Sequence, residues 1–165
     1  MLSYTQIERQ LLLYEIIYLS QEVEMADLMK RLDASKKTIE RDMKDLTDAG
    51  LVKLIYSRKE KTYQRGEETG VISEPIGTRR YMHLKKIQRL TIFMEELSSA
   101  TNGYGLDYME YNCKNRYFEL FPEVSERTRM RDYKILSNIG YRIEWNELEQ
   151  RHYVEGHLYQ VREKF

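Results

Sequence analysis

Apolar side chains recur at helical spacing over residues 6–19 and again, after a polar break, over residues 25–32. Each pattern predicts an amphipathic helix. Ser35 is then a suitable N-cap for a third helix that runs to about Ala49. Gly50 follows at the position where a left-handed residue commonly ends a helix.

Two short apolar stretches come next. Residues 51–56 predict a strand, and residues 61–64 predict a returning strand after a polar turn. The order helix, helix, turn, helix, hairpin is that of a winged helix-turn-helix. Residues 67–79 are rich in glycine and charge and predict a linker, and residues 81–100 predict another amphipathic helix.

The third predicted helix has a second copy later in the chain. Residues 35–50 and residues 125–140 align without gaps at a shift of 90. The identical pairs are Ser35/Ser125, Thr38/Thr128, Arg41/Arg131, Asp42/Asp132, Lys44/Lys134, Leu46/Leu136 and Gly50/Gly140. The same shift aligns Tyr63 with Tyr153, and a shift of 80 aligns residues 7–15 with residues 87–95 at three positions.

The repeat predicts a mainly α fold with small β-hairpin wings, built as two tandem winged helix-turn-helix domains. The first would occupy residues 1–66 and bind DNA. The second, divergent one would occupy residues 80–165, including a C-terminal strand extension. The alternative is one winged helix followed by an unrelated helical domain.

The segment from Leu32 to Leu51 resembles the N-terminal winged helix of DeoR-type regulators, which also precedes WYL effector domains. It has their serine N-cap, then a threonine, an Arg-Asp pair, a leucine and a glycine. The resemblance implies a bacterial transcriptional regulator that binds DNA as a homodimer. The tandem arrangement is similar to the paired units of Mga-like regulators and to plasmid replication initiators.

Composition narrows the classes further. The net charge is zero, so a basic surface must be local, and the lone Cys113 fits a reducing compartment. No apolar run is long enough to span a bilayer, so we expect a cytoplasmic protein without a membrane partner. No nucleophile motif, phosphate loop or metal-ligand spacing occurs, so we expect neither an enzyme nor a cofactor or metal. The sequence does not indicate a small-molecule effector.

Basic residues gather where a winged helix contacts DNA. The N-terminal turns of the third helix enter the major groove, and the wing lies beside them. Residues 35–65 hold nine basic and five acidic residues. The predicted DNA-binding residues of this copy are Ser35, Lys36, Lys37, Thr38, Arg41 and Lys44 on the helix and Arg58, Lys59 and Lys61 on the wing. For Arg41 a structural role in the Arg-Asp pair is the alternative.

The second copy is less basic, because residues 125–155 hold six basic and six acidic residues. Glu126 stands where Lys36 does, and Arg129 stands where Ile39 packs. Either the phase of this helix differs or the stem of Arg129 covers apolar surface. We predict DNA contacts for Arg127, Thr128 and Arg131, and also for Arg129 between them. A dimerisation or partner surface is the alternative.

The resulting hypothesis is a sequence-specific regulator that binds double-stranded DNA. Its competitor is a protein–protein adaptor, or a plasmid or chromosome-maintenance protein, built on tandem winged helices. The basic first copy argues against an adaptor for residues 1–66 but not for the second copy.

Overall fold

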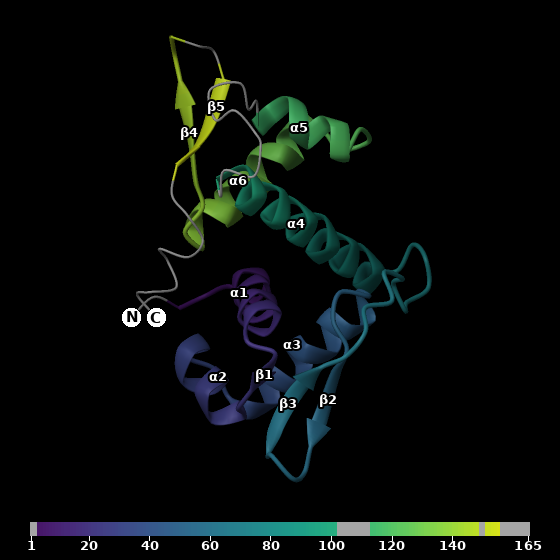
Figure 1. Cartoon of the computed structure of the whole chain (residues 1–165). Coiled ribbons are helices and arrows are strands. Elements are labelled where there is room, and N and C mark those ends of the chain that lie inside the picture. The colour runs from purple at the N-terminus through teal and green to yellow at the C-terminus, as the bar shows by residue number, and fades with distance from the viewer. Residues whose placement is uncertain (1–2, 102–112, 149–150, 156–165) are drawn as a thin grey trace. The chain divides into compact units, whose positions relative to one another are not determined.

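The computed structural model describes residues 3–101, 113–148 and 151–155, and it divides into two compact units. Unit 1 comprises Met1–Thr91 and unit 2 comprises Ile92–Phe165. Figure 1 shows the elements of each. The division falls inside a long helix, between Thr91 and Ile92.

Unit 1 begins with three helices and a small sheet. Its elements are α1 (Gln6–Leu19), β1 (Glu22–Val23), α2 (Met25–Leu32), α3 (Lys36–Asp48), β2 (Leu54–Ser57) and β3 (Thr62–Arg65). α1 starts at a capping box, in which the Thr5 hydroxyl accepts the Glu8 amide and the Glu8 carboxylate accepts the Thr5 amide. This order is that of a winged helix-turn-helix.

The sheet has three antiparallel strands in the order β1-β3-β2. β2 starts three residues after its predicted start and β3 one residue after its own. The buried Leu51 and Val52 belong to the segment that connects α3 to β2 rather than to the strand. β1 was not predicted, since a two-residue strand has no readable alternation. It pairs with β3 through Val23 opposite Tyr63.

The core of unit 1 is formed by the inward faces of its helices. Its fully buried side chains include Leu11, Leu13, Ile17, Leu28, Ile39, Leu46, Leu84, Ile87 and Leu90. The predicted linker, residues 67–79, is irregular as expected but is bonded to this unit. The amide of Gly70 donates to the carbonyl of Gly50, and the amide of Ser73 donates to that of Asp48. These bonds keep the segment against the end of α3.

The second half has a similar order of elements. They are α4 (Arg79–Thr101), α5 (Cys113–Leu120), α6 (Glu126–Asn138), β4 (Arg142–Asn146) and β5 (Arg151–Glu155). β4 and β5 form an antiparallel hairpin. The first turns of α4, up to Thr91, belong to unit 1, and its last turns, from Ile92, belong to unit 2.

Unit 2 has an aromatic core. Phe93 of α4 stacks on Tyr133 of α6 and meets Tyr117 of α5 edge-on, with ring centroids 6.0 and 5.1 Å apart. Cys113 is buried beside them, and its thiol donates to the Tyr133 hydroxyl at 3.2 Å. Burial raises the pKa of Cys113 to about 11, against the smaller lowering by this bond, so the thiol is protonated and unreactive.

Candidate nucleic-acid interface

The turn between α2 and α3 is short and well capped. Asp33 ends α2 in the left-handed region with φ of 47°, and the amide of Ala34 returns to the carbonyl of Met29. Ser35 then caps α3, because its hydroxyl accepts the amide of Thr38 at 3.3 Å. α3 therefore starts at a defined residue, with its first turn facing outward.

The inward face of α3 carries a buried carboxylate as well as apolar side chains. Asp42 is 1% exposed and accepts hydrogen bonds from Arg9 Nε at 2.5 Å and Arg9 Nη2 at 3.2 Å. Gln10 Nε2 donates to the same carboxylate at 3.1 Å. A buried carboxylate needs such partners to offset its lost hydration. The hydrogen bonds from Arg9 and Gln10 to Asp42 therefore tie α1 to α3.

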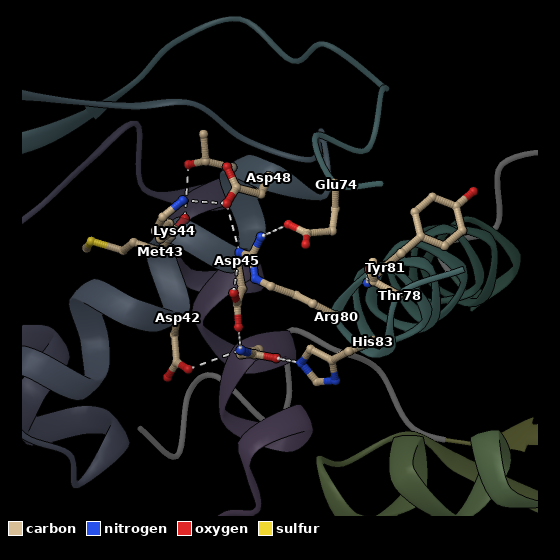
Figure 2. A network of polar contacts seen from close by, with 12 residues as sticks. Asp42, Met43, Lys44, Asp45, Asp48, Glu74, Thr78, Arg80, Tyr81 and His83 are labelled. Carbon is tan, nitrogen blue, oxygen red and sulfur yellow. Dashed lines mark hydrogen bonds and ion pairs between the residues drawn. The ribbon is translucent and has the colours of Figure 1, made fainter. Parts of the chain in front are cut away.

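Two further acids of α3 are tied to α4 by one arginine (Figure 2). Arg80 Nη2 lies 2.8 Å from Asp45 and 2.7 Å from Asp48, and Nη1 lies 2.7 Å from Glu74. Burial alone would raise the pKa of Asp48, but hydrogen bonds from Lys44 and Arg80 lower it below its usual value. The acidic side of α3 is thus neutralised within the protein.

The two side chains of the Arg-Asp pair, Arg41 and Asp42, point in opposite directions. Asp42 points into the unit, whereas Arg41 is exposed and forms no ion pair with any residue that the structure describes. The structural partner of Asp42 is Arg9, which lies on another helix. Arg41 therefore takes no part in the ion pair of Asp42, and its contact with DNA stays a prediction.

The outward face of α3 is basic. Lys36, Lys37, Arg41 and Lys44 are exposed. Lys36 lies 3.9 Å from Glu40 and Lys44 lies 2.6 Å from Asp48, and both lysine side chains remain at least 65% exposed. Such surface pairs contribute little and exchange readily for another anion.

The two predicted hydroxyls of this helix are engaged in the cap. The Ser35 and Thr38 oxygens lie 3.0 Å apart, and Thr38 is half-buried. Ser35 is exposed. One of the two hydroxyl protons is used in this bond, so a phosphate at the helix start would accept from the other hydroxyl and from the free first-turn amides.

The tip of the β2–β3 hairpin carries the three predicted wing cations. Arg58, Lys59 and Lys61 are exposed, and Lys61 adopts the left-handed region with φ of 55°. None forms an ion pair with a described residue. Below the tip, the tilted rings of Tyr56 and Tyr63 contact each other across the strands, with centroids 5.0 Å apart, and stiffen the hairpin.

α6 of unit 2 repeats the cap of α3. The Ser125 hydroxyl accepts the Thr128 amide at 3.2 Å, and Arg127 and Arg131 are exposed while Thr128 is half-buried. Arg129 is 1% exposed, so the suggestion that it contacts DNA is wrong. The phase of the helix is unchanged, and the arginine occupies the inward position that Ile39 has in α3.

Arg129 is accommodated by one carboxylate and two rings. Its guanidinium forms an ion pair with Glu126 and lies 4.6 Å from the centroid of Tyr133 and 5.9 Å from that of Phe118. Burial alone would lower the pKa of Arg129, but the hydrogen bonds to Glu126 and Tyr133 together raise it. The arginine therefore has a structural role.

Sequence reasoning missed several residues of these surfaces. Lys134 is exposed on α6 at the position of Lys44, and the repeat alignment was a signal that could have included it. Arg9, Gln10 and Arg80 hold α3 in place from segments more than 30 residues away, and no local pattern indicates such contacts.

Within the described ranges, no cluster of three or more acidic, histidine or cysteine side chains is arranged to hold a metal ion. Among the same residues, no helix combines the length and the apolar character needed to cross a membrane.

Residues 9–64 match a protein-family model described as an HTH domain. The match covers α1 to β3, which includes α3 and the wing. No curated protein and no solved structure matches the chain. The N-terminal part of this protein is therefore a helix-turn-helix DNA-binding domain.

Proposed function

We propose that the protein is a transcriptional regulator that recognises specific sequences of double-stranded DNA through α3 and the β2–β3 wing. The observation that carries this proposal is the division of α3 into two faces. Asp42, Asp45 and Asp48 are bound to Arg9 or Arg80 on one side. The four cations are exposed on the other side, with Glu40 as the one acid among them.

The outward face suits the major groove. Lys37 and Arg41 are one helical turn apart and have no competing ion pair among the described residues, so both can contact phosphates or guanine edges. Lys36 and Lys44 would exchange weak surface pairs for phosphates. The wing cations Arg58, Lys59 and Lys61 would bind the adjacent backbone.

The inward face keeps α3 rigid. Each hydrogen bond that Asp42 and Asp45 form with α1 or α4 is present before DNA arrives. A helix that is already positioned loses less conformational freedom on binding, which favours affinity.

Unit 2 is, in this proposal, a divergent second winged helix. Its order of helices and hairpin, the Ser125 cap and the positive φ of Gly140 at the end of α6 support this relation. A DeoR-like regulator would also form a homodimer, with unit 2 assisting DNA binding or dimerisation.

Selection from a genomic fragment library, followed by binding titrations at several salt concentrations, tests the proposal. We expect enrichment of a common site and an affinity for it that exceeds that for random duplex by at least about 1,000-fold. Affinity without salt dependence or sequence preference would contradict it. Protein capture that survives loss of the α3 cations would instead support an adaptor.

A further inference from the structure

α6 presents unpaired cations at the same helical positions as α3. Arg127, Arg131 and Lys134 align with Lys37, Arg41 and Lys44 and are exposed. None forms an ion pair with any residue in the described part of the chain. The spacing i, i+4, i+7 places the three on one face of the helix.

Fewer carboxylates lie beside the cations of α6 than beside those of α3. In α3, Lys44 binds Asp48 at 2.6 Å, but Asn138 stands at the corresponding position of α6 and carries no charge. Glu40, at the centre of the α3 face, corresponds to Met130. α6 has therefore lost both carboxylates that flank the cations in α3.

The acid gained by α6 lies to one side of these cations. Glu126 forms ion pairs with the buried Arg129 and, at 3.7 Å, with Lys114 of α5. The hydrogen bond from Arg129 outweighs desolvation and lowers the pKa of Glu126, so it is ionised and compensated. The zero net charge of residues 125–155 therefore conceals a positive outward face.

We infer that this α6 face (Arg127, Met130, Arg131 and Lys134) is a second DNA-reading surface, which binds the major groove of double-stranded DNA. The inference rests on the proposed function, since DNA must first be the ligand of the chain. The cations contact phosphates or guanine edges, as they do on α3.

Met130 gives this surface a sequence preference. It is 50% exposed and lies between Arg127 and Arg131 on the same face. An apolar side chain in the major groove gains from contact with the C5-methyl group of thymine. The α6 half of the site therefore contains thymine opposite Met130, whereas the α3 half, with Glu40 there, does not require it.

A second copy of the chain is a poorer occupant of this face. A two-fold interface places the same patch of both protomers together, so the three cations would face three identical cations around one methionine. Like charges disfavour that contact, whereas phosphates neutralise all three.

The test compares two charge-matched double variants of the full chain. Arg127→Gln with Arg131→Gln removes two cations of the α6 face. Arg79→Gln with Lys85→Gln removes two exposed cations of α4 that have no ion pair in the described residues. On the selected duplex, we expect the first variant to weaken binding by about tenfold or more and to reduce the salt slope by about two. The second should change the affinity less than about threefold.

Equal effects of the two variants would overturn the inference, because they would indicate only general charge attraction. Sedimentation velocity without DNA must show the same oligomeric state for the α6 variant and the wild type. If the variant alone dissociates a dimer, the α6 face is an interface between copies and the inference is wrong.

Lys37→Gln with Arg41→Gln separates this inference from the proposed function. If that variant binds as the wild type does, the proposed function itself fails. If it loses binding while the α6 variant behaves like the α4 control, only the α6 inference fails.

A base-level readout tests Met130. Replacing thymine by deoxyuridine in the α6 half-site should weaken wild-type binding by about threefold or more but leave Met130→Ala unaffected. Equal losses for both proteins would contradict the methyl contact.

Discussion

α3 and α6 have the same N-cap and the same length and share three outward cations, but they differ in their outward acids and at one buried position. Asp42 is held by Arg9 and Gln10, and the corresponding Asp132 accepts a hydrogen bond from the Tyr117 hydroxyl at 2.6 Å. The apolar Ile39 has an ionised counterpart in Arg129. The comparison indicates that a buried position behind a capped helix can change from isoleucine to arginine while three outward cations keep their positions.

The largest effect should come from the buried carboxylates. Asp42→Ala leaves Arg9 without its carboxylate partner and should lower the free energy of unfolding of unit 1 by about 3 to 5 kcal/mol. Asp132→Ala, which removes the acceptor of the Tyr117 hydroxyl bond, should destabilise unit 2 by at least about 1 to 3 kcal/mol. Urea denaturation with amide-exchange readout for each unit measures both. An unchanged free energy of unfolding for Asp42→Ala would contradict the structural role of this carboxylate.

Next in size is the glycine that ends α3. Gly50 has φ of 75°, and a Cβ atom there would lie 2.5 Å from the amide nitrogen of Val71. Gly50→Ala should therefore destabilise unit 1 by about 2 kcal/mol or more, from backbone strain and from displacement of residues 70 and 71. Gly140→Ala, at φ of 109°, is the comparison variant in unit 2. If thermal denaturation gives Gly50→Ala the melting temperature of the wild type, residues 70 and 71 can move away without cost and the prediction is wrong.

The ion pair of unit 2 should have a smaller effect. Glu126→Ala removes the carboxylate partner of the buried Arg129 and should destabilise unit 2 by about 1 kcal/mol, since Glu126 itself is half exposed. Arg129→Ile, which restores the residue type of α3, should be neutral or stabilising. If Arg129→Ile is the more damaging of the two in urea denaturation, the arginine contributes more than Ile39 does.

The smallest effect concerns pH. His83 of α4 lies 2.9 Å from Gln10 Oε1. Burial lowers the pKa of His83 below 6.5. The charges of Asp45 and Asp42 raise this pKa, whereas those of Lys86 and Arg80 lower it further. The unfolded chain then binds a proton at His83 more readily than the folded one does. The stability of unit 1 should therefore fall as pH drops below about 6.5 and be fully present above it.

Urea denaturation at about pH 7.5 and about pH 5.5 measures this change for the wild type and for His83→Gln. The variant should lose less stability between the two pH values. An equal loss would assign the pH dependence to other groups.

Local patterns predicted the helices of unit 1 well. Residues 6–19 and 25–32 form helices with the expected bounds, because their apolar spacing and caps are determined within a few residues. The exposure of the α3 cations could be predicted for the same reason, because the apolar positions of a helix identify its buried face and therefore also its exposed face. Whether they contact DNA stays a prediction.

What could not be predicted depends on distant partners. The bonds of Asp42 and Arg80 join segments more than 30 residues apart, and no local period encodes them. Composition indicated an irregular segment at residues 67–79 but not its bonds to the end of α3. For Arg129, burial depended on Glu126 and Tyr133, so the sequence alone left its role open.

The central claim is that the outward face of α3 binds DNA while its inward face is structural. The most direct test is the salt dependence of binding for Lys37→Gln with Arg41→Gln, measured by fluorescence anisotropy on the selected duplex. Our account predicts an unchanged free energy of unfolding, an affinity lowered by about 100-fold, and a salt slope reduced by about two. Wild-type affinity and slope in a folded variant would contradict it.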